Sequence, residues 1–168
     1  MIETIATKVC TILATVGMDK AEKWIKAKYS GKKVLSIEEI KKITKILFID
    51  DEDFGVTLST IRNAGWNVNQ INDVINFDAE DIKSADIIFM DYVGVGNVLT
   101  PKESGIGLLK SIKKRYPEKF IIFCSGYAGH IPGSEVHSIA DAWIDKHADA
   151  FVFVDQIEVA AKKIHESR

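Results

Sequence analysis

Acidic residues follow directly after two short apolar runs of this chain. Asp50 and Asp51 come after residues 45–49, and Asp91 comes after residues 85–90. Runs that are this short and this rich in β-branched and aromatic residues are typical of parallel strands buried on both faces. Ligands of such sheets collect at the carboxyl ends of the strands. Three carboxylates there repel one another unless a cation or a proton lies between them, so the pattern predicts a functional site.

Strand-like runs alternate with helix-like stretches from residue 45 onward, which predicts an α/β fold with parallel strands. The expected strands are 45–49, 66–71, 86–90, 119–124 and 150–154. Five helices are expected: one after Asp53, a short one within 73–84, one over 105–115, one that begins near 134, and a last one after Asp155.

The position of the fifth strand depends on a choice between two registers. Residues 140–146 could form this strand, but apolar residues at 136, 139, 140, 143 and 144 complete one face of a helix. Residues 151–154 are also richer in β-branched and aromatic side chains. We therefore predict a helix that includes residues 136–144 and a strand over 150–154.

Residues 1–44 are predicted to form a helical extension that precedes a domain spanning 45–168. Two apolar stripes at helical spacing are separated by Gly17, and Ser36 with Glu39 indicates a third, brief turn. These apolar faces must be covered by the α/β domain or by another chain. A homodimer formed through the N-terminal helices is therefore one expectation.

Composition excludes several classes of protein. The 168 residues are 46% apolar and 27% charged with a net charge of −2, which is ordinary for a globular protein and gives no strong field for nucleic acid. No apolar stretch approaches the roughly 18 residues of a membrane span. We expect a cytoplasmic protein without a membrane or nucleic-acid partner. Of the two cysteines, Cys10 and Cys124, the second lies in an apolar run and is expected to be a buried, reduced thiol.

The order of these motifs resembles the receiver domain of two-component response regulators over about residues 45–167. The resemblance implies a flavodoxin-like (βα)5 sandwich with a parallel sheet in the order 2-1-3-4-5. The motifs that carry it are Asp50-Asp51 after the first strand, Asp91 after the third, Gly105-Ile106-Gly107-Leu108-Leu109 at the start of a helix, and Cys124-Ser125-Gly126 after the fourth strand.

The resemblance also implies a role for each site residue. Asp50, Asp51, Asp91 and the main-chain carbonyl of Val93 would bind magnesium, a cation that prefers hard oxygen ligands. Asp91 would be the phosphoacceptor and attack a phosphoryl group as a nucleophile. Ser125 would hydrogen-bond the phosphoryl group, and Phe151 on the fifth strand would be the switch aromatic.

A histidine kinase or a phosphotransfer protein would then donate the phosphoryl group. No output domain follows the fifth strand and its helix, so we expect output by binding to a downstream protein that the sequence does not identify. The protein would accept the group and would not be a turnover enzyme.

One departure from the family leaves an alternative open. The family carries a Lys at the end of strand five, where the preferred register places Val154. The rival register would supply Lys146 as this lysine and Trp143 as the switch aromatic. A missing lysine, together with the altered loop after Asp91, would favour a receiver-like interaction module that works without phosphorylation.

A phosphatase of the haloacid dehalogenase type is a further alternative. Asp51 would be its nucleophile and Asp53 its acid, but that class has a hydroxyl residue where Gly55 stands.

Overall fold

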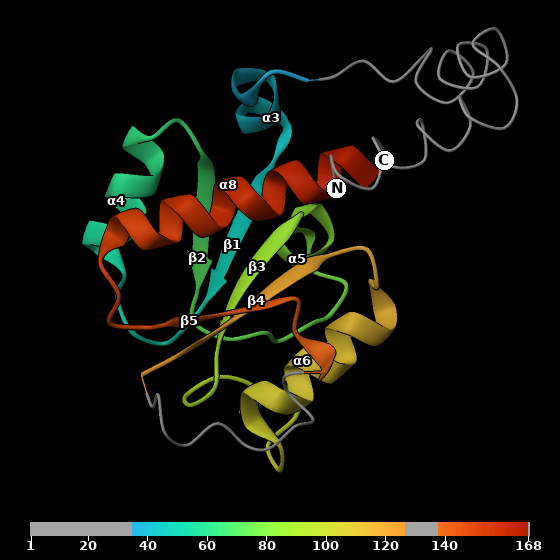
Figure 1. The fold of residues 1–168 in the computed structure, drawn as a ribbon. Coiled ribbons are helices and arrows are strands. Elements are labelled where there is room, and N and C mark those ends of the chain that lie inside the picture. The colour runs from blue at the N-terminus through green and yellow to red at the C-terminus, as the bar shows by residue number, and fades with distance from the viewer. Residues whose placement is uncertain (1–34, 127–137, 168) are drawn as a thin grey trace, which may run out of the picture. The chain divides into compact units, whose positions relative to one another are not determined.

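The computed structural model describes residues 35–126 and 138–167, which form five parallel strands and the helices around them (Figure 1). The expected helices within residues 1–34 lie outside the described residues. The elements in chain order are α3 (Ile37–Ile43), β1 (Lys45–Ile49), α4 (Gly55–Asn63), β2 (Asn67–Ile71), α5 (Glu80–Ser84), β3 (Ile87–Asp91), α6 (Ser104–Arg115), β4 (Phe120–Ser125), β5 (Ala142–Asp145) and α8 (Ala150–Ser167).

The sheet has the strand order β2-β1-β3-β4-β5, and every neighbouring pair is parallel. Successive residues of β1 face opposite sides of the sheet. Phe48 packs with residues of α3, α4 and α8, whereas Leu47 packs with residues of α5 and α6. Helices therefore cover both faces, and Figure 1 shows α8 running across one of them. The predicted flavodoxin-like fold is confirmed.

Helix α3 begins with the predicted capping box. The Ser36 side chain accepts a hydrogen bond from the Glu39 N–H, and the Glu39 carboxylate accepts one from the Ser36 N–H at 2.9 Å. Ile40 lies in the core, and α3 packs against α8. Among the described helices, none is both long and apolar enough to cross a membrane.

The prediction for the fifth strand is wrong. Strand β5 is Ala142–Asp145, where a helix including residues 136–144 was predicted. Residues 150–154, predicted as the strand, lie in α8, so the last helix begins before Asp155. The predicted residues 134–137 lie outside the described part of the chain. The Asp141 carboxylate accepts a hydrogen bond from the Ile121 N–H at 2.8 Å, and the Asp141 N–H donates to the Ile121 carbonyl at 2.9 Å. These bonds fix the register of β5 on β4.

The apolar run that predicted a strand at 150–154 is the start of a helical stripe. The residues of α8 buried in the core are Phe153, Ile157, Ala160, Ala161 and Ile164, which share one face of the helix. Phe151 lies off this face and is 60% exposed. A short apolar run of β-branched and aromatic residues is compatible with either a strand or a buried helix, which explains the error.

Candidate metal centre

Three carboxylates meet at the carboxyl ends of β1 and β3. These strands are neighbours, with Ile49 paired to Met90, so Asp50 and Asp91 reach the same edge of the sheet. Carboxylate oxygens of Asp50, Asp51 and Asp91 all lie within 4.8 Å of one another. Asp50 is 2% exposed and Asp91 is 5% exposed, whereas Asp51 is open to solvent. The structure thus brings together the acids that the sequence pattern singled out.

Lys146 follows β5 directly and enters the same cluster. Its ammonium nitrogen lies 2.9 Å from Asp50 Oδ1, 2.7 Å from Asp91 Oδ2 and 3.2 Å from Glu52 Oε2. The Lys146 side chain is only 8% exposed, so solvent screens these ion pairs weakly. Sequence reasoning preferred Val154 at this place, and the rival register gave the only signal for Lys146.

Burial and the interactions within the cluster shift the pKa of two of its groups. Burial raises the pKa of Asp50 above its ordinary value, and hydrogen bonds from the Glu52 N–H and from Lys146 offset this effect only in part. Burial by itself would lower the pKa of Lys146. Hydrogen bonds to Asp91 and Asp50 outweigh it, so the pKa of Lys146 is raised and the amine stays protonated.

A glutamine side chain organises the loop that carries two of the acids. Gln70 Nε2 donates to the main-chain carbonyls of Asp50 at 3.0 Å and Glu52 at 2.6 Å, while Gln70 Oε1 accepts from the Phe54 N–H at 3.4 Å. The Asp50 carboxylate accepts from the Glu52 N–H at 2.9 Å. Sequence reasoning missed Gln70, because its role depends on the pairing of β2 with β1.

Glycines let the loop after β3 approach the acids closely. Gly94 has a φ of +84°, and a Cβ built on it would lie 2.2 Å from Asp51 Oδ1. A Cβ on Gly105 would lie 2.2 Å from the Asp91 carbonyl oxygen. Larger side chains at either position would push the backbone away from the carboxylates, and at Gly94 the positive φ adds strain.

The donor set suits a hard divalent cation. Carboxylate and carbonyl oxygens are the ligands that magnesium accepts, and the carboxylates of Asp50 and Asp91 are held by hydrogen bonds from backbone N–H groups and from Lys146. Asp91 Oδ1 accepts from the Tyr92 N–H at 2.6 Å, which fixes the direction of that carboxylate. The residues present therefore fit a magnesium ion.

No protein-family model matches the chain, and no curated protein matches it. Solved structures do match. A CheY-like response regulator receiver domain protein from Methanospirillum hungatei JF-1 is 19% identical, with a TM-score of 0.57 over 75% of this chain and 99% of that one.

The chain has the fold of a response regulator receiver domain. A response regulator from Burkholderia pseudomallei, solved with a phosphorylated aspartic acid, calcium ion and citrate, is 20% identical with a TM-score of 0.52 over 74% of this chain and 72% of that chain. NtrX from Brucella abortus, solved with ATP, is 22% identical with a TM-score of 0.60; 75% of this chain matches 28% of NtrX.

The receiver fold brings one further predicted residue to this edge of the sheet. Ser125 ends β4, is 4% exposed, and its carbonyl accepts a hydrogen bond from the Lys146 N–H at 3.1 Å. Val93 lies in the loop just after β3 and is 57% exposed. The placement of Phe151 on strand five is wrong, because it lies in the first turn of α8. Trp143 occupies β5 instead.

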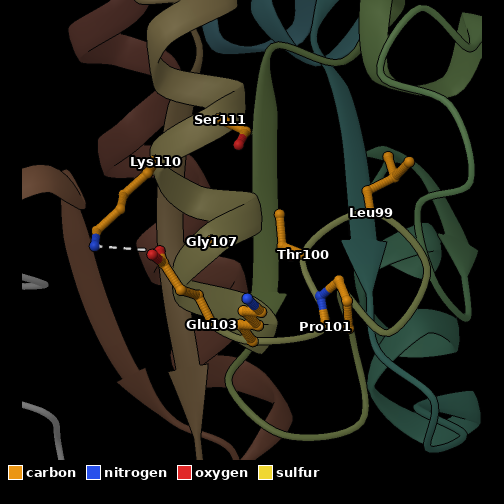
Figure 2. Close-up of a pocket in the computed structure, with 8 residues that line it drawn as sticks. Leu99, Thr100, Pro101, Glu103, Gly107, Lys110 and Ser111 are labelled. Carbon is orange, nitrogen blue, oxygen red and sulfur yellow. Dashed lines mark hydrogen bonds and ion pairs between the residues drawn. The ribbon is translucent and has the colours of Figure 1, made fainter.

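Two hollows lie beside the loops of the described domain. The smaller, with a volume of about 230 Å³, opens beside the acid cluster and is lined by Glu52, Asp53, Phe54, Val56, Thr57, Lys146 and His147. The larger, of about 530 Å³, lies between residues 99–103 and α6 (Figure 2). Two of its lining residues form an ion pair, with Lys110 Nζ 3.3 Å from Glu103 Oε2. Its lining includes none of the three clustered carboxylates.

Proposed function

We propose that this protein is a signalling receiver that accepts a phosphoryl group on Asp91 from a histidine kinase or a phosphotransfer protein. Asp50, Asp51, Asp91 and the main-chain carbonyl of Val93 would hold magnesium. The observation that carries the proposal is the meeting of three carboxylates and Lys146 at one edge of the sheet. The Burkholderia relative of the same fold, with its phosphorylated aspartic acid and calcium ion, supports it.

The chemical step is a transfer between two nucleophiles. A carboxylate oxygen of Asp91 attacks phosphorus, a P–O bond forms, the P–N bond to the donor imidazole breaks, and the donor nitrogen leaves with the bonding electron pair. Magnesium, when bound, offsets the negative charge that opposes the approach of a phosphoryl group to a carboxylate. Asp91 is suited to the role because the Tyr92 N–H and Lys146 both hold its carboxylate in place.

Lys146 and Ser125 would receive the transferred group. Lys146 already contacts Asp91 Oδ2, so a modest movement of its ammonium would let it pair with a phosphoryl oxygen. Ser125 stands at the end of the neighbouring strand β4 and would donate a hydrogen bond to another oxygen. Trp143 on β5 takes over the switch role that the sequence assigned to Phe151.

Output would be protein binding. The candidate surfaces are the α8–β5 face and the segment before Leu35, where the compact unit of the described fold begins. The protein would be cytoplasmic. One phosphoryl group would be accepted per molecule, without substrate turnover.

The phosphorylation-independent alternative loses its main support. It depended on Val154 ending strand five, whereas the residue after β5 is Lys146. The full set of charged groups therefore favours the phosphorylated receiver.

Beryllofluoride, a phosphoryl mimic, tests the proposal. We expect magnesium and beryllofluoride to change the tryptophan fluorescence of the protein, and we expect Asp91→Asn to abolish the change. Trp143→Phe should also remove it while leaving magnesium binding intact. An identical response in Asp91→Asn would contradict the proposal.

A further inference from the structure

The carboxylate of Asp73, in the connection after β2, is bonded to the loop that follows β3. Asp73 Oδ1 accepts a hydrogen bond from the Gly96 N–H at 2.6 Å, and Asp73 Oδ2 accepts one from the Asn97 N–H at 3.0 Å. Asp73 Oδ1 also accepts from the Val74 N–H at 2.7 Å. A carboxylate that accepts several backbone N–H bonds forms charge-assisted contacts, which are roughly twice as strong as neutral ones.

Further contacts connect the segment bonded to Asp73 with the proposed metal ligands. Asn97 Nδ2 donates to the Gly94 carbonyl at 2.7 Å, which turns the loop back toward its own start. Gly94 in turn lies so close to Asp51 that a Cβ on it would be 2.2 Å from Asp51 Oδ1. Val93, whose carbonyl is the proposed fourth ligand, is the preceding residue. Asp73 is therefore linked through Asn97 and Gly94 to two of the proposed ligands.

The rest of the loop is held by its own contacts and by the core. The Thr100 N–H donates to the Gly96 carbonyl at 2.9 Å, and Thr100 Oγ1 donates to the Ser104 carbonyl at 2.9 Å. Thr100 packs over Gly107 of α6, where a Cβ would lie 2.6 Å from Thr100 Cβ (Figure 2). Val95 is fully buried. These contacts hold Val95 and the Gly96 carbonyl, whereas the Gly96 and Asn97 N–H groups of the same loop are held by the Asp73 carboxylate.

We infer that Asp73 is a positioning residue for the magnesium site, acting through the loop after β3. The inference rests on the proposed function. Removing the carboxylate frees the Gly96 and Asn97 N–H groups, so the loop gains freedom and the Val93 carbonyl and Asp51 are no longer held in place for the cation. Groups behind a metal's direct ligands typically change affinity by 10–100-fold, and Asp73 stands one step further back, so we expect a loss of about tenfold.

Asp73→Asn tests the inference, with Asp78→Asn as the matched control. Both changes remove one negative charge from the connection between β2 and α5, but Asp78 accepts its side-chain bond from the Tyr116 hydroxyl at 3.2 Å. Magnesium titration by calorimetry should give a Kd about tenfold weaker for Asp73→Asn. The control should match the wild-type protein. Asparagine keeps one acceptor oxygen and loses the other, so amide hydrogen exchange should be faster at one or both of Gly96 and Asn97 in Asp73→Asn alone.

Asn97→Ala gives a second, independent variant. It removes the bond to the Gly94 carbonyl and keeps the backbone N–H that Asp73 binds. We expect weaker magnesium binding here too, and less than additive loss when both changes are combined, because both variants break the same chain of contacts. A merely structural role would lower the melting temperature without changing the Kd of the folded protein.

The outcomes separate this inference from the proposed function. If the wild-type protein binds magnesium and both Asp73→Asn and Asn97→Ala bind it as tightly as Asp78→Asn, the positioning role is overturned and the proposed function stands. If the wild-type protein binds no magnesium and does not respond to beryllofluoride, both are overturned.

Discussion

The ammonium nitrogen of Lys146 lies 2.7 Å from a carboxylate oxygen of Asp91, although 55 residues separate the two in sequence. The same nitrogen lies 2.9 Å from Asp50. One buried ammonium group thus forms ion pairs with two buried carboxylates where strands β1, β3 and β5 end. Without Lys146 or a metal ion, the two carboxylates would face each other uncompensated.

Lys146→Met is expected to lower the free energy of unfolding in the absence of magnesium by about 3–5 kcal/mol, the usual result of removing one partner from a buried ion pair. Added magnesium should recover more stability in this variant than in the wild-type protein, because a cation can replace the lost charge. Chemical denaturation with and without magnesium measures both effects. Lys110→Met is the control: its partner Glu103 is 55% exposed, so the loss should be at most about 1 kcal/mol. Equal losses in the two variants would contradict the account.

The two phenylalanines at the start of α8 should respond differently to truncation. Phe153 is fully buried, with its ring centroid 5.7 Å from that of Phe89 and 5.9 Å from that of Phe54, whereas Phe151 is 60% exposed. Phe153→Ala should cost about 3–5 kcal/mol of unfolding free energy. Phe151→Ala should change it by no more than about 0.5 kcal/mol. Thermal or urea unfolding measures both changes. A loss of unfolding free energy that is larger in Phe151→Ala than in Phe153→Ala would contradict the placement of these residues in α8.

Most of the fold could be predicted from the sequence because β1, β3 and β4 are short apolar runs that are bounded by polar residues. Two of these runs end in Asp50 and Asp91, so the parallel arrangement alone predicted that the acids meet. The fifth strand could not be assigned in this way. Strand β5 carries only one buried residue, Ile144, and the hydrogen bonds between Asp141 and Ile121 that fix the strand join residues far apart in the sequence.

The residues that support the site could not be predicted either, because they also act through contacts between distant parts of the sequence. Gln70 and Asp73 act through hydrogen bonds to backbone 16 to 24 residues away, and nothing in their local sequence marks them. Lys146 became visible only once the register of β5 was known. Sequence patterns report burial and periodicity, whereas these roles depend on which loops the sheet brings together.

Asp50→Asn should stabilise the metal-free protein at neutral pH while weakening magnesium binding. The folded pKa of Asp50 is raised above 3.8 by burial, so the folded state binds this proton more tightly than the unfolded state does. The stabilising contribution is complete below a pH of 3.8 and is lost as the pH rises through the folded pKa. Ionised Asp50 therefore costs stability at neutral pH, and a neutral amide avoids that cost.

Urea denaturation of Asp50→Asn and the wild-type protein at neutral and acidic pH measures this effect. The variant should be the more stable protein at neutral pH, and its advantage should shrink in acid. A variant that is less stable than the wild-type protein at neutral pH without metal would contradict it.

Cys124 should resist alkylation in the folded protein. Its side chain is 1% exposed, and burial, followed by the nearby charge of Asp50, raises the pKa of the thiol well above its ordinary value. The reactive thiolate is therefore scarce through the neutral and mildly alkaline range. Peptide mapping after iodoacetamide treatment should show Cys124 modified only after denaturation. Rapid labelling under native conditions would show that β4 is less protected than the structure indicates.

The most direct test of the central claim is to map the phosphorylated residue. The wild-type protein would be incubated with magnesium and acetyl phosphate, and the modified peptide would be located by mass spectrometry after borohydride trapping of the acyl phosphate. The account predicts a single phosphoryl group on Asp91 that requires magnesium and is absent from Asp91→Asn. Phosphorylation at another residue, or none in a protein that is folded and saturated with magnesium, would contradict it.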